Sequence, residues 1–117
     1  MGDDLQACRD SVRPDLALYI GGMGARSKNY YNDLTRRLGY EEEAVNIQNL
    51  YLAGSKKEAE ALVPDALIDE VCLVGSADRI RDRLSAWKQA AADNQVGTML
   101  LNGASVEAMR VVAEAVL

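Results

Sequence analysis

The chain has 117 residues, 49% hydrophobic and 26% charged, with a formal net charge of −5 and no histidine. This length suits one small domain, and without histidine a Ser-His-Asp triad, a Cys-His pair and a histidine zinc site are excluded. The acidic balance argues against a nucleic-acid groove, and no apolar run is long enough to span a bilayer. Two distant cysteines and an N-terminus unlike a signal peptide predict a cytoplasmic protein.

Helices are predicted throughout the first 70 residues. Apolar side chains at steps of three or four predict a helix over residues 3–20, which Pro14 would kink or split in two. The stretch Gly21-Gly22-Met23-Gly24 is expected to break it, because glycine is costly inside a helix. Further helices, delimited by acidic first turns, glycine and proline, are predicted over 28–38, Glu41–Ala53, Lys56–Leu62 and Pro64–Glu70.

Two short strands are predicted in the last third of the chain. Val71–Val74 is a β-prone run that Gly75-Ser76 ends, and Val96–Leu101 (VGTMLL) is typical of a buried strand. The helix between them is predicted to bury one stripe of side chains, namely Ile80, Leu84, Trp87 and Ala91. A last helix, Ser105–Val116, is predicted to bury Val106, Met109, Ala113 and Val116.

The order strand, helix, strand, helix predicts two parallel strands in an α/β chain that is rich in helix. We expect one domain over residues 1–117, with a helical region at 3–70 and the strand-helix-strand-helix unit at 71–117. Two parallel strands do not form a stable sheet alone, since parallel sheets need both faces covered and usually four or more strands. The cover must come from the helices of residues 3–70 or from another chain.

Five short motifs point to a known family. They are YIGGMG at residues 19–24, NYYNDL at 29–34, QNLYLAG at 48–54, VPDALIDE at 63–70 and LVG at 73–75. With them the chain resembles the C-terminal third of the luciferase-like monooxygenase family, and most closely those members that use the deazaflavin coenzyme F420. The resemblance covers roughly residues 5–115, which is nearly the whole chain.

The resemblance implies the C-terminal portion of a (β/α)8 barrel that binds F420, or alternatively FMN, and passes a hydride between this cofactor and a small organic substrate. The relatives carry their catalytic groups and most of their cofactor-binding residues on earlier strands. The resemblance therefore assigns no catalytic residue here, and we expect the chain alone to be inactive. Its expected partner is a second copy or a separately encoded N-terminal barrel part, with no nucleic acid and no membrane. The alternative is a non-enzymatic oligomeric or interaction module.

A glycine-rich stretch is the first candidate for cofactor binding. Gly21, Gly22 and Gly24 would expose backbone N–H groups before a predicted helix, and Arg26 and Lys28 add positive charge. Such a loop would receive a phosphate or the polyglutamate tail of F420. The alternative is a simple break between two helices, whose glycines permit positive φ.

A second candidate is Gly75 with Ser76, which follows the first predicted strand. Barrel enzymes build their sites at the carboxyl ends of strands and often hold phosphate there. The alternative is that Ser76 only caps the helix that begins after it. We expect no metal site, because no residues stand at the spacing of a ligand set.

Overall fold

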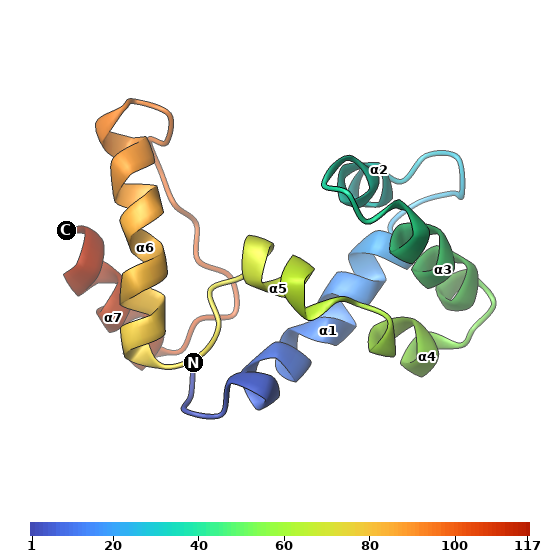
Figure 1. The fold of residues 1–117 in the computed structure, drawn as a ribbon, viewed down its shortest axis with the longest axis horizontal. Helices are drawn as coiled ribbons and strands as arrows, with labels where there is room; N and C mark the ends of the chain where they lie inside the picture. The colour runs from blue at the N-terminus through green and yellow to red at the C-terminus, as the bar shows by residue number, and fades with distance from the viewer. The chain divides into compact units, whose positions relative to one another are not determined.

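The computed structural model describes residues 1–117, which form seven α-helices and no β-strand. The helices are α1 Leu5–Gly22, α2 Tyr30–Arg37, α3 Glu41–Leu52, α4 Lys56–Ala61, α5 Asp65–Val71, α6 Ala77–Ala92 and α7 Val106–Val116 (Figure 1). The chain divides into two compact units. We call Arg9–Cys72 the helical unit, and Met1–Cys8 together with Leu73–Leu117 the terminal unit. No helix combines the length and the apolar character that crossing a membrane requires.

Helix α1 is continuous over 18 residues although Pro14 lies inside it. Proline removes one backbone hydrogen bond, but the bonds on either side hold the helix together, so the predicted split is wrong. The helix also includes Gly21 and Gly22 and ends before Met23. The break therefore begins two residues later than we predicted.

The two glycines stay helical because α3 packs closely on them. A Cβ atom on Gly21 would lie 2.5 Å from Cβ of Tyr51, and one on Gly22 would lie 2.6 Å from Cε1 of the same ring. Both distances are well below ordinary van der Waals contact. Close helix packing, and not turn geometry, therefore accounts for Gly21 and Gly22.

The ends of α2 and α3 follow the prediction that glycine terminates them. Gly39 and Gly54 have φ values of +101° and +89°, the left-handed region that favours glycine. After α2, the N–H of Gly39 donates to the carbonyl of Arg36 (3.0 Å), and the N–H of Tyr40 donates to that of Thr35 (3.2 Å). The same bond pattern closes α3, so both helices end in a Schellman motif.

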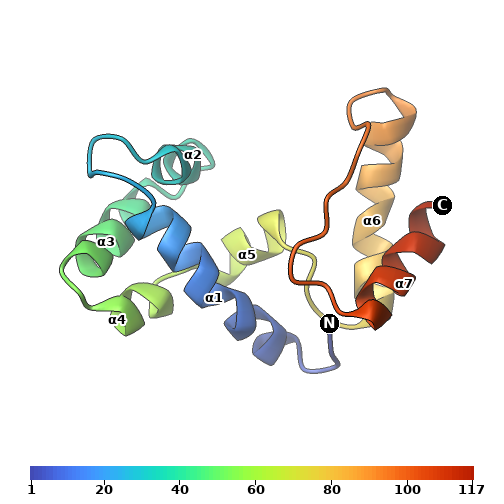
Figure 2. The same ribbon diagram turned by 180° about the vertical axis from the view of Figure 1, so that it is seen from behind.

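The helical unit has a core of small and aliphatic side chains in which polar groups are also buried. The apolar members are Ala17, Ile20, Ala44, Ile47, Ala59, Val63, Leu67 and Ile68, and the polar ones are Asn29, Asn32, Thr35 and Gln48. Helix α3 contacts both α2 and α4 (Figures 1 and 2). Nδ2 of Asn32 donates to the carbonyls of Ile20 (3.0 Å) and Ala44 (2.8 Å), so one amide ties the end of α1 to α3.

Charged side chains join α1 to α5 within the helical unit. Arg9 donates to both carboxylate oxygens of Asp69, at 3.1 and 2.6 Å. Arg13 donates to Asp65 and to the carbonyl oxygen of Val63. The hydrogen bond to Asp69 raises the pKa of Arg9 and outweighs the opposing effect of burial. Each helix contributes two charges four residues apart, which places both on one face of that helix.

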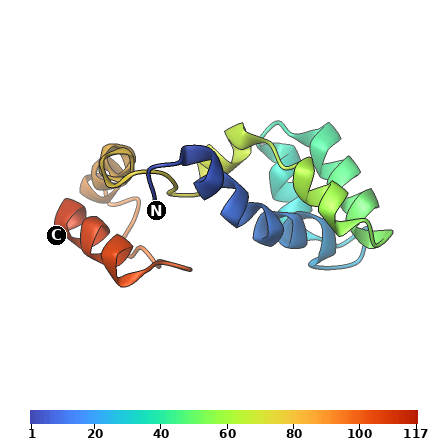
Figure 3. The same cartoon turned by 90° about the horizontal axis from the view of Figure 1, so that it is seen from below.

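The terminal unit has a smaller core between α6 and α7. Its buried members are Ile80, Leu84, Val111 and Val112, with Leu73, Ala77, Met99 and Ala115 packed partly buried against them. Figure 3 looks nearly down the axis of α6 and shows α7 crossing beside it. Both helices begin at a serine cap, which was expected for Ser76 before α6, whereas Ser105 caps α7 instead of being its first residue.

The two predicted strands are wrong. Val71 ends α5 and the residues after it are an extended connection, while Val96–Leu101 is an irregular segment that runs beside α6 (Figures 1 and 2). A strand needs a neighbouring strand for its backbone hydrogen bonds, and a parallel pair alone does not persist in water. The chain is therefore rich in helix as predicted, but without a sheet.

Five predicted core positions in the terminal unit are also wrong. Ile80 and Leu84 of α6 are buried as expected, but Trp87 and Ala91 on the same stripe are exposed. On α7 the buried residues are Val111 and Val112, whereas Val106, Met109 and Val116 are exposed. Helix α7 carries apolar residues on both sides, so its periodicity alone does not identify the inward face.

Candidate functional site

The glycine-rich stretch is divided between a helix and a loop. Gly21 and Gly22 belong to the last turn of α1, where backbone N–H groups bond to carbonyls four residues earlier. Gly24 lies in the following loop with φ +148°, and a Cβ atom there would collide with the carbonyl oxygen of Lys28. Of the three glycines, Gly24 is therefore the one whose backbone conformation shapes the loop.

Two cations stand in this loop, and both are exposed. The N–H of Lys28 donates to the carbonyl of Ala25 (2.8 Å), which closes a tight turn around Arg26. The guanidinium of Arg26 donates to Oδ1 of Asn49, so this cation is held over α3. The loop thus presents two positive charges within three residues, in a chain whose net charge is −5.

Asn29 fixes the loop between the end of α1 and the start of α2. Its Oδ1 accepts a hydrogen bond from the N–H of Asn32 (3.0 Å), which makes it the N-cap of α2. Its Nδ2 donates to the carbonyls of Tyr19 and Ile20, at 3.1 and 3.0 Å. This capping role was not predicted from the sequence. An asparagine directly before a helical pattern is the signal that could have found it.

Gly75 and Ser76 lie in the terminal unit and perform a capping function. Gly75 has φ +113°, and a Cβ atom there would lie 2.6 Å from Cδ of Arg79. Oγ of Ser76 accepts a hydrogen bond from the N–H of Arg79 (3.2 Å), and the carbonyl of Gly75 accepts one from Gly2 (2.8 Å). The capping alternative for Ser76 is confirmed, while phosphate binding at this position stays a prediction.

The pKa shifts of Cys72 and Tyr40 both favour the protonated form of the side chain. Burial, with a smaller contribution from Asp15, raises the pKa of the Cys72 thiol, which disfavours the nucleophilic thiolate. The hydrogen bond from Tyr40 to Glu70 (2.7 Å) raises the pKa of that phenol, so it stays protonated. No group of three or more histidine, cysteine or acidic side chains gathers to hold a metal ion.

Many unrelated proteins are rich in helix and have a glycine-containing loop with two cations, so these features alone do not identify a family. The comparisons with known proteins do. Residues 1–94 match the luciferase-like monooxygenase family. The chain belongs to this family, which confirms the resemblance inferred from its motifs.

The chain is also 36% identical over 108 residues to a protein of Mycobacterium tuberculosis whose description names a coenzyme F420-dependent oxidoreductase. The alignment covers 92% of this chain but 30% of the relative, so the chain spans less than a third of that protein's length. No solved structure gives a significant match.

Proposed function

We propose that the chain is the C-terminal part of a coenzyme F420-dependent oxidoreductase, which passes a hydride between the coenzyme and a small organic substrate, with FMN as the alternative cofactor. The observation that carries this proposal is 36% identity over 92% of the chain to a protein described as F420-dependent. In this proposal residues 1–117 form one partial domain of a (β/α)8 barrel. Its remaining strands come from other residues of a longer polypeptide or from a separate chain.

The loop around Arg26 fits the anionic end of F420. The guanidinium of Arg26 is already positioned by Asn49, and Lys28 extends its ammonium group into solvent from the same turn. These two cations would hold the phosphate or the glutamate tail by charge-assisted hydrogen bonds. The bound coenzyme supplies the hydride chemistry, and the role of these residues is to bind and orient it.

A chimera tests the proposal. In it, this chain replaces the matched 108 residues of the Mycobacterium tuberculosis relative, and binding and turnover of F420 are measured against the relative itself. We expect the chimera to bind F420 and the chain alone to show no turnover. A folded chimera that binds neither F420 nor FMN would contradict the proposal, and sustained F420 turnover by the chain alone would contradict its inactivity.

Two double variants of the chimera locate the anion site. Arg26→Ala with Lys28→Ala is expected to raise the Kd for F420 at least about tenfold, since each charge-assisted hydrogen bond contributes about 1.5–3 kcal/mol. Lys57→Ala with Lys88→Ala removes the same charge elsewhere and serves as the matched control. Equal Kd values for the two double variants would remove Arg26 and Lys28 from the site.

We also propose a cytoplasmic location. Its support is the sequence, which holds two cysteines far apart and no CxxC pair. Fractionation of cells that produce a tagged chain tests this location, and recovery in an exported fraction would overturn it.

A non-enzymatic interaction module is the second candidate, and the exposed apolar residues of the terminal unit favour it. Leu100 is 91% exposed and Val106 is 69% exposed, so both leave apolar surface open to a partner. Native mass spectrometry of the chain with F420 and FMN separates the two candidates. A cofactor-free oligomer supports the module, and a species that carries one of the cofactors supports the oxidoreductase.

A further inference from the structure

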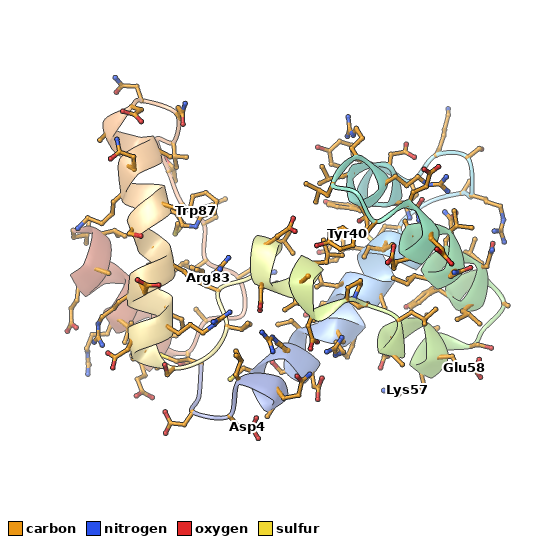
Figure 4. The ribbon with its side chains drawn as sticks, viewed as in Figure 1. Asp4, Tyr40, Lys57, Glu58, Arg83 and Trp87 are labelled. Carbon is orange, nitrogen blue, oxygen red and sulfur yellow. The ribbon has the colours of Figure 1, made fainter.

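The loop before α7 contains the one Asn-Gly pair of the chain, Asn102-Gly103. Both residues are exposed, and neither takes part in a hydrogen bond or an ion pair. The pair lies near the end of the connection between α6 and α7, which runs along the side of α6 from which Trp87 and Arg83 project (Figure 4). The side-chain amide of Asn102 and the backbone N–H of Gly103 are therefore both open to reaction.

Gly103 leaves room for a reaction between these two groups. A backbone nitrogen that attacks the side-chain carbonyl of the preceding asparagine closes a five-membered ring, and a Cβ atom on the attacking residue hinders this close approach. Gly103 has no Cβ, its φ is +69°, and no atom beyond the adjacent residues lies within 4 Å of the place where a Cβ would stand. The loop thus combines an exposed amide with an accessible nitrogen that no hydrogen bond holds.

The other five asparagines do not have this combination. Four of them are followed by a residue whose backbone N–H already donates to a carbonyl of the chain, namely Asn32, Asn46, Asn49 and Asn94. Asn94 is the nearest comparison, because it is also exposed but the N–H of Gln95 donates to the carbonyl of Ala90 (2.8 Å). Asn29 is buried, and its amide forms hydrogen bonds through both its oxygen and its nitrogen.

We propose that Asn102 is a site of spontaneous deamidation, with water as the only co-reactant. The deprotonated backbone nitrogen of Gly103 attacks Cγ of Asn102. The new bond from this nitrogen to Cγ replaces the bond from Cγ to Nδ2, and the amide leaves as ammonia with the proton. Water then opens the cyclic imide at either of its carbonyl carbons. Aspartate forms where the new bond breaks, isoaspartate forms where the original peptide bond breaks, and no atom is oxidised or reduced.

The product differs from the native chain in charge and in its main chain. Either acid makes the net charge one unit more negative than −5. Isoaspartate also adds one backbone atom, three residues before the Ser105 cap of α7. A carboxylate close to the start of a helix is favourable, since the first N–H groups of the helix attract negative charge. The inference requires neither a cofactor nor another chain, so it is independent of the proposed function.

Timed incubation of the purified chain, followed by peptide mapping, tests the inference. Trypsin cuts after Lys88 and after Arg110, so one peptide carries both Asn102 and Asn94 and contains its own comparison. We expect Asn102 to become an acid at least about ten times faster than Asn94, a ratio that corresponds to about 1.4 kcal/mol in activation free energy. Isoaspartate is expected among the products at this position.

The rate in the folded chain and two substitutions sharpen the test. A segment without hydrogen bonds has an opening free energy near zero, so we expect the rate at Asn102 in the native chain to lie within about threefold of the rate in urea. Asn102→Gln is expected to remove the fast reaction, because glutamine would have to form a six-membered ring. Asn94→Gln is the matched control and is expected to leave the rate at Asn102 unchanged.

Three results would overturn the inference. The first is a reaction at Asn102 in the folded chain that is no faster than the reaction at Asn94. The second is a native rate more than about threefold below the rate in urea, which would show that the loop protects the pair. The third is aspartate without isoaspartate, which would indicate direct hydrolysis of the side chain in place of attack by Gly103. Circular dichroism during the incubation confirms that the reacting chain is folded.

Discussion

The helical unit and the terminal unit differ in how their backbone groups are satisfied. In the helical unit, turns and buried amides use the carbonyls that helices leave open, as Asn29 and Asn32 do at the end of α1. In the terminal unit, two helices enclose a core of four buried residues, and Val96–Leu101 between them forms no backbone hydrogen bond.

The difference follows from what joins the helices in each unit. A helix satisfies its backbone within its own segment, so a group of short helices needs only caps and a core. Val96–Leu101 is neither helix nor strand, so its backbone groups have no partner of either kind within the chain. The helical unit thus closes its helices with hydrogen bonds, although Nε2 of the buried Gln48 has none, whereas Val96–Leu101 in the terminal unit has no backbone hydrogen bond.

The largest effect is expected where a buried amide holds the helical unit together. Asn32→Ala removes one donor from the carbonyl of Ile20, which keeps its bond from Asn29, and the side-chain donor from the carbonyl of Ala44. It also removes the acceptor of Arg36 (2.8 Å). We expect the free energy of unfolding to fall by about 3 kcal/mol, since three hydrogen bonds are lost and each contributes about 0.5–1.5 kcal/mol. Urea denaturation followed by circular dichroism measures this change.

Asn46→Ala is the matched control, because Asn46 is an exposed asparagine on α3. Its effect is expected to stay within about 0.5 kcal/mol, as for most surface substitutions. Equal losses for the two variants would show that the amide of Asn32 does not hold α1 and α3 together.

The next effect concerns the close approach of α1 and α3. Gly21→Ala places a methyl group 2.5 Å from Cβ of Tyr51, which cannot move without moving α3, so we expect a loss of about 2 kcal/mol. Gly22→Ala meets the ring of Tyr51 instead, which can turn away, and we expect a smaller loss of about 1 kcal/mol. Thermal unfolding measures both.

When Tyr51 is replaced by alanine, the effect of Gly22→Ala on the free energy of unfolding is expected to change from a loss to a gain. In a Tyr51→Ala background, Gly22→Ala is expected to stabilise the chain by up to about 1 kcal/mol. The remaining close contact, at 3.3 Å, is with Cδ1 of Leu18 at the end of a flexible side chain, so helix propensity dominates. Stabilisation by Gly21→Ala in the otherwise native chain would contradict the packing explanation.

Local signals in the sequence predicted most of the helices. The glycines that end α2 and α3 and the serines that cap α6 and α7 act through bonds to residues a few positions away, so the sequence displays both partners. The predicted split at Pro14 and the predicted helix end before Gly21 were wrong because no local signal decides them. Their tolerance inside α1 depends on tertiary packing, which local propensity does not contain.

The sequence predicted which residues of the candidate loop are exposed cations, but not which hydrogen bonds position them. Arg26 and Lys28 stand in an exposed loop as the sequence indicated, whereas the bond from Arg26 to Asn49 spans 23 positions and has no local signal. The ion pairs between α1 and α5 did leave a signal, since charges four apart occur as Arg9 with Arg13 and as Asp65 with Asp69. Their pairing across the unit still required the structure.

A moderate effect is expected at this ion-pair cluster. Asp69→Asn weakens a doubly hydrogen-bonded contact in which the side chains of Arg9 and Asp69 are 18% and 22% exposed. We expect a loss of about 1 kcal/mol in the free energy of unfolding at low salt, which shrinks as salt is added.

The control for this prediction is Asp78→Asn, because the side chain of Asp78 is 96% exposed in its pair with Arg81. We expect a change within about 0.5 kcal/mol there. If the two variants behaved alike at low salt, the cluster would not stabilise the packing of α1 on α5.

The smallest effect is a chemical one, at Cys72 in the helical unit. Burial and then Asp15 raise its thiol pKa, so this residue contributes stability below the ordinary thiol pKa that is lost as pH rises through the raised value. In a Cys8→Ala background we expect iodoacetamide to react more slowly with the native chain than with the chain in urea, with a rate that rises only at higher pH.

Asp15→Asn removes the smaller cause of the raised pKa and is expected to raise the reaction rate of the native chain slightly, whereas Asp3→Asn is expected to leave this rate unchanged. A reaction rate in the native chain equal to the rate in urea would show that the helical unit does not protect Cys72. The core of the helical unit would then not extend to its last residue.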